Sequence, residues 1–318
     1  MLWRESPFAE CAYRSRFRDW NTQSAVRAKP LPSFAPDAGR GKLFFTPELV
    51  PLATHPAILE RGPDLVERIL ALHLFGHLNF TDTLENEVVA PVAYMIGRCQ
   101  LGFSLPPAML NDARRIAIDE MHHALFAAGF TETIAALSGV EPPAPRRPLF
   151  LRRLDEMIAS QDPAMAPFMK FFFAVVSETL ITGTLTRVPS DERVVGGVRT
   201  MLRDHAEDEA RHHAYFADAL AFAWPQLATP QRAAVGPLLP RFIAAYLAPD
   251  LGEVQDWLER VGFSAGEAKK TIEESYAPTI AAATFRRAAE TPLRLMKRAG
   301  VLDDPLTADA FHASGLMA

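Results

Sequence analysis

The sequence predicts an all-α protein, and three features support that prediction. From residue 63 onward, long stretches without proline carry apolar residues at three- and four-residue spacing, which is the period of an amphipathic helix. The period-two alternation of a half-buried strand is not evident anywhere in the chain. Two Glu-x-x-His sequences add a helix-specific pattern, because residues three apart share one helical face.

Composition and charge describe a folded globular chain and argue against two classes of partner. Of the 318 residues, 49% are hydrophobic and 22% are charged, which is typical of a chain with a sizeable core. The net charge is −5. Without a basic excess, the chain is not expected to bind nucleic acid or an anionic membrane surface.

Three features favour a cytoplasmic location. Cys11 and Cys99 are too few for a disulfide framework and lack the C-x-x-C spacing of zinc or thiol-redox sites. Residues 1–7 contain an acid and a proline where a signal peptide needs an apolar run. The longest apolar stretch, residues 165–185, contains Lys170 and Glu178, which predicts a buried helix rather than a membrane span.

The expected elements follow from the breakers along the chain. Seven prolines between positions 30 and 63 predict an irregular N-terminal wrapping segment over residues 1–63 with one short helix. Pro91 is expected to kink its helix or break one turn. Ser104 and Ser190 are expected to act as N-caps, and the stretch from Leu302 to form a loose tail. Residues 64–225 are assigned to a helical bundle and 226–318 to C-terminal helices on the same domain. Helices are expected near 64–79, 82–101, 107–138, 149–160, 164–187, 191–224, 229–247, 250–260, 265–276 and 278–299.

The Glu-x-x-His sequences are the strongest functional signal. Glu120 precedes His123 by three residues and Glu209 precedes His212 by three, so each pair points a carboxylate and an imidazole at one spot. With 9 His in 318 residues, a given Glu has roughly a 3% chance of such a partner, so one match is weak evidence. Two matches, each preceded by Asp, are much less expected by chance.

A ferritin-like bundle that binds two metal ions needs two more carboxylates from two further helices. Glu178 stands alone in a phenylalanine-rich run, where burying an unpartnered carboxylate is costly. The other must be Glu85 or Glu87, and helical phase favours Glu85 because its face is apolar. The predicted fold is therefore a ferritin-like four-helix bundle core with additional helices.

Spacing and phase extend the predicted ligand set. Glu85 to Glu120 spans 35 residues and Glu178 to Glu209 spans 31, and turn signals lie near both midpoints. His205 lies four residues before Glu209 and shares its face, so it is a seventh candidate ligand, with a buried structural histidine as the alternative. Asp119 and Asp208 are placed to accept a hydrogen bond from the far nitrogen of a ligating imidazole.

This constellation resembles the non-haem diiron N-oxygenases of the p-aminobenzoate N-oxygenase family. The likeness covers residues 64–225 at the motif level, and the third histidine separates that family from the commoner two-histidine diiron proteins. The resemblance implies two iron ions, O2 as co-substrate, an external electron donor and oxidation of an amine to a hydroxylamine and onward to nitroso and nitro products in antibiotic biosynthesis. The implied ligands are Glu85, Glu120, His123, Glu178, His205, Glu209 and His212.

Several alternatives stay open at this point. The amine could belong to a free aryl amine or to an amino acid, free or tethered to a carrier protein. Manganese or zinc could replace iron, because these donors do not strictly select one metal. Other classes are a ferritin-like ferroxidase, a radical-generating subunit, and a helical module in which these residues only form salt bridges. A homodimer is one of the open oligomeric states.

Overall fold

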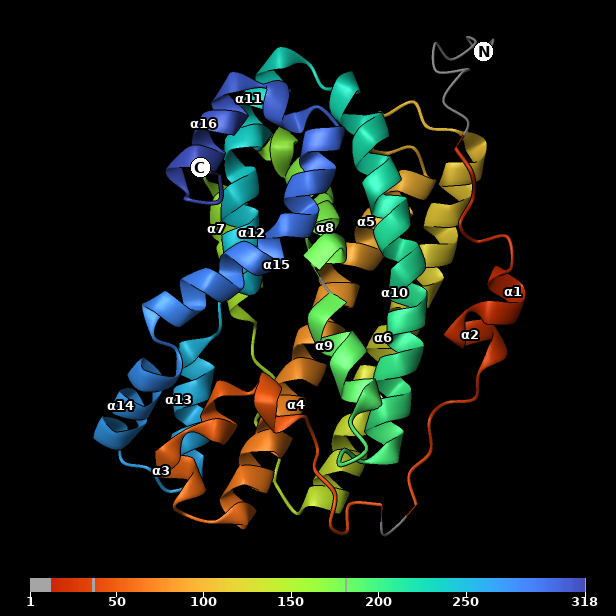
Figure 1. The fold of residues 1–318 in the computed structure, drawn as a ribbon. Coiled ribbons are helices and arrows are strands. Elements are labelled where there is room, and N and C mark those ends of the chain that lie inside the picture. The colour runs from red at the N-terminus through yellow and green to blue at the C-terminus, as the bar shows by residue number, and fades with distance from the viewer. Residues whose placement is uncertain (1–12, 36–37, 181, 318) are drawn as a thin grey trace.

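Four helical segments run side by side at the centre of the molecule and form a bundle (Figure 1). The computed structural model describes residues 13–35, 38–180 and 182–317, without the side chains of 182–184 and 278–284. Cys11 and the start of the predicted wrapping segment lie outside these residues. The bundle consists of α4 (Pro63–Leu84) continued by the π-helical segment η3 (Glu85–Val89) and α5 (Ala90–Gly97), α6 (Pro107–Ser138), α8 (Ala166–Leu180) with α9 (Thr182–Arg187), and α10 (Gly196–Ala223).

Shorter elements cover the bundle. The described part of the N-terminal segment carries more helix than the single short one expected. Its first part lies beside α10, and its later part packs on α4 (Figure 1). It holds α1 (Trp20–Gln23), α2 (Ala25–Ala28), η1 (Pro47–Leu49), η2 (Pro51–Thr54) and α3 (Pro56–Leu59). The remaining helices are α7 (Leu149–Ala159), α11 (Thr229–Val235), α12 (Leu239–Leu247), α13 (Leu251–Arg260), α14 (Ala265–Ser275), α15 (Pro278–Arg298) and α16 (Pro305–Ala313). Within the described ranges no strand forms, and one isolated parallel bridge joins Leu43 to Val194. The all-α prediction is therefore confirmed.

The first bundle helix differs from its prediction. Two helices were expected over 64–79 and 82–101, but the chain stays helical from Pro63 to Gly97. Pro91 cannot donate the backbone hydrogen bond that an α-helix needs, and the wider π-helical turn of η3 directly precedes it. The helix thus absorbs the proline without breaking, and the π-helical turn begins at Glu85.

Both expected serine caps are wrong. α6 begins at Pro107 with Pro106 as its N-cap, because two consecutive prolines fix the backbone at its first turn. Ser190 ends the short 3-10 helix η5 (Val188–Ser190), and α10 starts only at Gly196. The backbone bonds between Leu43 and residues 193 and 195, each 2.9 Å long, pair Val194 with Leu43 and keep it out of the helix. The end of α6 at Ser138 is confirmed, with Gly139 in the left-handed conformation that terminates a helix.

The C-terminal stretch is ordered helix, so the expected loose tail is wrong. Asp304 caps α16 by accepting a hydrogen bond from the Thr307 backbone N–H at 3.0 Å. Phe311 is fully buried in the core shared by the bundle and the C-terminal helices. Thr307 packs directly on Gly236, where a Cβ atom would lie 1.9 Å from its hydroxyl oxygen. The short 3-10 helix η7 (Gly236–Leu238) also interrupts the single helix expected over 229–247.

The apolar core is divided into two clusters. One contains Leu84, Val88 and Phe173 together with residues of the C-terminal helices, and the other contains Leu78 and Phe126 at the opposite end of the bundle. Between them, at mid-height, lies a layer of buried acids and histidines. By length and composition, Pro163–Ser190 could cross a membrane, but 65% of its most apolar window is buried against the rest of the protein. Its described part is a core helix, as expected.

The contact between α13 and α4 predicts a pH-dependent stability. Gly76 of α4 lets Glu253 and Trp257 approach closely, and burial, followed by repulsion from Asp250, raises the pKa of Glu253 to about 7. A carboxyl with a raised pKa binds an extra proton in the folded state, so stability falls as pH rises from the ordinary value of 4.5 toward 7. Relative to Glu253→Gln, the wild-type free energy of unfolding should fall by about 2 kcal/mol across this range, after allowing for solvent screening. Urea unfolding of both proteins at pH 4.5 and 7.5 measures the difference, and parallel pH profiles would contradict it.

Candidate metal centre

Seven buried side chains from all four bundle segments meet at mid-height. Three overlapping groups each offer ligand atoms within 4.8 Å of one another. The first group contains both Glu-x-x-His pairs, the second joins Glu85, His205 and Glu209, and the third joins Glu85, Glu120 and Glu178. No member is more than 5% exposed. The structure therefore brings together all seven residues that the sequence analysis selected.

The two Glu-x-x-His pairs face each other across the bundle. Nδ1 of His123 lies 3.0 Å from Oε2 of Glu120 and 3.4 Å from Oε1 of Glu209. Nδ1 of His212 lies 2.8 Å from Oε1 of Glu120 and 3.3 Å from Oε1 of Glu209. The same nitrogen of each imidazole thus points at the shared carboxylates, and the i, i+3 spacing on α6 and α10 produces this convergence.

The other three candidates complete the layer from its remaining sides. Nε2 of His205 lies 3.1 Å from Oε1 of Glu209 and 3.8 Å from Oε1 of Glu85. The His205 ring centroid is 4.2 Å from that of His123. Glu178 approaches from α8, with Oε2 at 4.0 Å from Nδ1 of His212. Glu85 enters from the first residue of η3.

Unpartnered polar atoms show that the layer fits a bound cation. Oxygens of all four glutamates, including both of Glu178, are buried without a hydrogen-bond partner. Nδ1 of His212 also makes no hydrogen bond, although it lies 2.8 Å from Oε1 of Glu120. Leaving so many buried acceptors unsatisfied is costly for a folded protein unless something else binds them. Four carboxylates match the charge of two divalent metal ions, and imidazole with carboxylate donors suits iron.

The crowding of buried carboxylates also shifts the pKa values of the layer. Burial, followed by repulsion from neighbouring glutamates, raises the pKa of Glu85 and of Glu178 well above the ordinary value. Burial opposes charge on His212, but Glu120 and Glu209 outweigh it and raise its pKa well above the usual range. Protons are thus drawn to the space between these groups, where metal cations would relieve the same repulsion.

Asp119 and Asp208 contact the far nitrogens of the two imidazoles in a crossed arrangement. Asp119, on α6, lies 3.3 Å from Nε2 of His212 on α10. Asp208, on α10, lies 3.1 Å from Nε2 of His123 on α6. Each aspartate therefore orients the histidine of the opposite helix, which leaves Nδ1 directed at the carboxylates.

The N-terminal segment supplies contacts that the sequence analysis missed. The indole N–H of Trp20 donates to both carboxylate oxygens of Asp119, at 2.8 and 2.9 Å. The backbone N–H of Ala25 donates to Asp208 at 3.2 Å. The Phe17 ring stacks on His212 with centroids 6.0 Å apart. No local pattern indicates these contacts, because they join residues about a hundred or more positions apart.

Four other histidines stay outside the layer. His73 and His77 pack edge-on against Phe45, and burial lowers their pKa to about 4 and about 3, so both are neutral at pH 7. His122 packs against Phe126, and His213 contacts the backbone carbonyl of Glu178. None of the four belongs to a group of potential metal ligands among the described residues.

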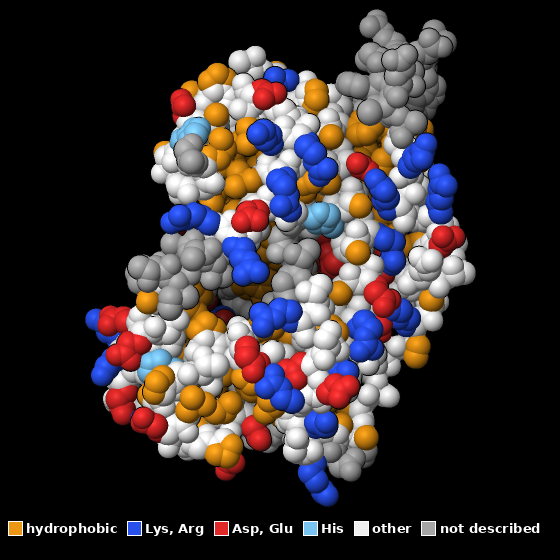
Figure 2. Space-filling model, in the orientation of Figure 1, with side chains coloured by type: hydrophobic (Ala, Val, Ile, Leu, Met, Phe, Trp, Pro, Cys, Tyr) orange, Lys and Arg blue, Asp and Glu red, His pale blue; other side chains and the backbone are white. Residues whose placement is uncertain are grey.

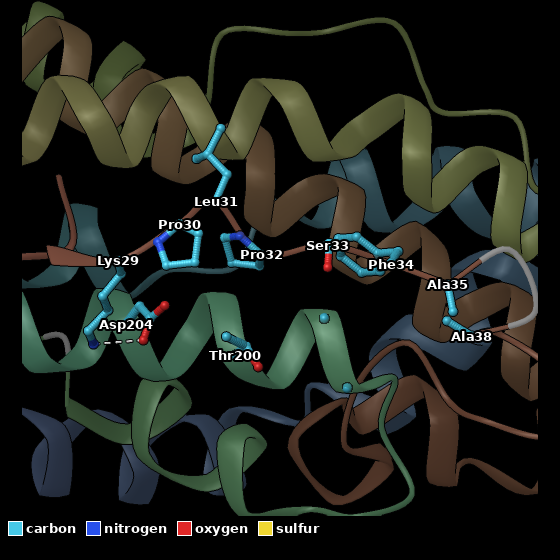
Figure 3. Close-up of a pocket in the computed structure, with 12 residues that line it drawn as sticks. Lys29, Pro30, Leu31, Pro32, Ser33, Phe34, Ala35, Ala38, Thr200 and Asp204 are labelled. Atoms are coloured by element: carbon cyan, nitrogen blue, oxygen red, sulfur yellow. Dashed lines mark hydrogen bonds and ion pairs between the residues drawn. The ribbon is translucent and has the colours of Figure 1, made fainter.

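A cavity of about 620 Å³ lies between the N-terminal segment and α10, away from the glutamate and histidine layer (Figure 3). Residues 29–35 and Ala38 form one wall, and the other comes from the first turns of α10. Lys29 bridges the cavity at one end by pairing with Asp204 at 2.7 Å. None of the seven candidate ligands lines it, so it is separate from the candidate metal centre.

The geometry predicts two iron ions per chain. The seven side chains already converge, so binding should need little rearrangement, and the unpartnered oxygens should make it strong. Elemental analysis after anaerobic Fe(II) loading and desalting measures the stoichiometry, with Glu87→Gln as a control, since Glu87 is exposed and pairs with Arg147. An iron content near zero in both proteins would contradict the prediction.

Comparison with known families identifies the chain. The family model of the p-aminobenzoate N-oxygenase AurF matches residues 19–300, which include all seven residues of the layer and Trp20. A search of curated proteins finds no match. Because the family model spans most of the 318 residues, the chain belongs to the p-aminobenzoate N-oxygenase AurF family of diiron arylamine N-oxygenases.

Proposed function

We propose that this protein uses two iron ions and O2 to oxidise an aryl amine at nitrogen. In the first step, R–NH2, O2, two electrons and two protons give R–NHOH and H2O, and further turnovers lead to the nitroso and nitro compounds. The observation that supports this best is the buried seven-residue layer with unpartnered oxygens on all four glutamates. Family membership supports the N-oxygenation chemistry.

Each side chain of the layer has a definable part in this reaction. The four glutamates and the three histidines would hold the ions, which when bound supply the electrons that reduce O2. Asp119 and Asp208 keep Nε2 of each paired imidazole occupied, so that Nδ1 is the nitrogen available to metal. The two apolar clusters on either side of the layer exclude water from it.

An aryl amine suits the surroundings of the layer better than an aliphatic amine. Nitrogen must offer its lone pair, and an aryl amine is neutral at pH 7 whereas an aliphatic amine is protonated. Tyr246, whose pKa is raised well above its usual range by burial and by the nearby Glu178, belongs to an aromatic group beside the layer. Its ring centroid lies 5.5 Å from Phe80 and 6.4 Å from Phe173. We place the aryl ring of the substrate against this group, where edge and face contacts between rings are favourable.

The reaction needs an external electron donor, and we propose that it takes place in the cytoplasm as a step of secondary metabolism. An amino acid, free or carrier-bound, is the alternative substrate, and it would need a group to remove the ammonium proton. The glutamate carboxylates of the layer are the nearest bases, and in this proposal they bind the metal ions instead.

A single-turnover assay tests the proposal. The protein is loaded with Fe(II) without oxygen, mixed with a panel of aryl amines and amino acids, and exposed to ¹⁸O2. Mass spectrometry should detect one labelled oxygen on an aryl amine nitrogen. Iron oxidation without labelled product from any amine would instead favour a ferroxidase.

A further inference from the structure

A continuous chain of hydrogen bonds leads from the metal layer to the protein surface through Trp20. Nε2 of His212 lies 3.3 Å from Oδ2 of Asp119, and the same carboxylate accepts the indole N–H of Trp20 at 2.8 and 2.9 Å. His212 and Asp119 are fully buried, whereas Trp20 is partly exposed. We infer that this chain is the route by which external electrons reach the metal centre, an inference that rests on the proposed diiron function.

The route is specific to one side of the layer. The matching path from His123 passes to Asp208 and ends at the backbone N–H of Ala25 and the side chain of Arg211. Neither group is aromatic or redox-active. Only the His212 side ends in an indole, whose extended π-system can couple electronically to a donor outside. Electron tunnelling weakens steeply across gaps, and contacts of 2.8 to 3.3 Å replace gaps along this path.

The indole is held in place at the surface. Its N–H is fixed by Asp119, and the Arg27 guanidinium lies 5.9 Å from the ring centroid. Ala25 and Lys29, on the same segment, bind α10 through Asp208 and Asp204. The N-terminal segment thus positions Trp20 rigidly against the bundle instead of leaving it on a free arm.

The surface beside Trp20 indicates the class of donor. Between residues 13 and 30 the chain carries five basic residues and one acid, although its net charge is −5. Two of the five, Arg16 and Lys29, form ion pairs with acids of α10. Arg14 and Arg18 are exposed and form no ion pair with another described residue, and Figure 2 shows Lys and Arg side chains along this edge of the molecule. Opposite charge steers partners and fixes their orientation. The fitting donor is an acidic one-electron carrier protein, for which a reduced [2Fe–2S] ferredoxin is the probe.

The electron balance of the step is simple. Each ferredoxin is oxidised by one electron, and one ferric ion is reduced to ferrous. Two successive transfers return a diferric centre to the diferrous state, and no bond forms or breaks in Trp20, Asp119 or His212. Trp20 is therefore a positioning residue that couples donor to metal, not a group that touches substrate.

The test compares Trp20→Phe with wild type in the iron-loaded, oxidised protein. Phenylalanine keeps an aromatic ring but loses the N–H that binds Asp119. Reduction by ferredoxin, followed as loss of ferric absorbance without any amine, should slow by more than an order of magnitude. Iron content and single turnover after chemical reduction with dithionite should stay near wild type. Trp257→Phe is the matched control, because Trp257 is buried against α4 and distant in sequence from the route.

A second variant changes exposed arginines that do not contact the layer. Arg14→Gln with Arg18→Gln should weaken ferredoxin binding to the iron-free protein and remove most of its salt dependence, whereas Arg260→Gln with Lys269→Gln should not. If Trp20→Phe loses iron, the ferredoxin binding of the two double variants tests the inference instead. Wild-type ferredoxin reduction in Trp20→Phe, an equal slowing in Trp257→Phe, or unchanged ferredoxin binding in the arginine variant would overturn the inference. If chemically reduced wild type yields no oxidised amine, the proposed function fails, while the reduction rates still test the route.

Discussion

Replacing Glu178 by Gln should abolish amine oxygenation and at the same time stabilise the metal-free protein. Both carboxylate oxygens of Glu178 are buried without a hydrogen-bond partner, and the residue is 1% exposed. Without metal, burial and neighbouring glutamates oppose its charge, so a neutral amide of the same shape relieves repulsion. We expect the free energy of unfolding of the apoprotein to rise by about 1–3 kcal/mol. The amide is a poor metal ligand, so product formation should fall to background.

The two halves of this prediction are measured separately. Thermal and urea unfolding of the metal-free proteins gives the stability change, and single-turnover product analysis gives the activity. Glu87→Gln makes the same chemical change at an exposed position and should alter neither. A Glu178→Gln apoprotein clearly less stable than wild type would count against an unpartnered carboxylate at a metal site.

Replacing His205 by Ala should leave most of the iron bound and still remove most of the amine oxygenation. Six other candidate donors would still hold the ions, so the loss of one neutral imidazole is not expected to empty the site. Nε2 of His205 lies 3.1 Å from Glu209 and 3.8 Å from Glu85, close enough to bind one ion directly. Its loss changes the coordination and electron density of that ion, so O2 consumption should be uncoupled and release hydrogen peroxide.

A merely structural histidine would give a different pattern. We expect the ferric absorption spectrum of His205→Ala to change, and added imidazole to restore part of the amine oxygenation. His122→Ala is the control, because His122 sits beside His123 but packs outward against Phe126. Wild-type turnover and coupling in His205→Ala would show that His205 is only a buried core residue.

The sequence by itself was enough to predict the helical fold and the composition of the layer. Residues at i, i+3 and i+4 on a helix must share a face, so Glu120 with His123, and His205 with Glu209, could be paired from their spacing alone. The lone carboxylate of Glu178 in an apolar run carried its own energetic signal, since such a group is costly to bury without a partner. These inferences depend only on helix geometry and on the residues next to each position in the sequence.

Local reasoning failed where two elements compete or where a contact spans the chain. The two serines do not cap helices, because prolines start α6 and a backbone bridge from Leu43 delays the start of α10. The expected tail forms α16 because Phe311 packs into the apolar core. The π-helical turn that begins at Glu85 accommodates Pro91, six residues later in the same helix. A regular period of 3.6 residues does not predict such a turn.

Only the tertiary structure decided how the metal layer is supported. Asp119 could have oriented either imidazole, and the packing of α6 against α10 gave it His212 of the opposite helix. The bond from Trp20 to Asp119 joins residues 99 positions apart, and that from Ala25 to Asp208 joins residues 183 apart. Helical periodicity specifies which side chains share a face, whereas the partner of that face depends on how distant segments pack together. The residues of the layer could therefore be selected from the sequence as candidate ligands, but their hydrogen-bond partners could not.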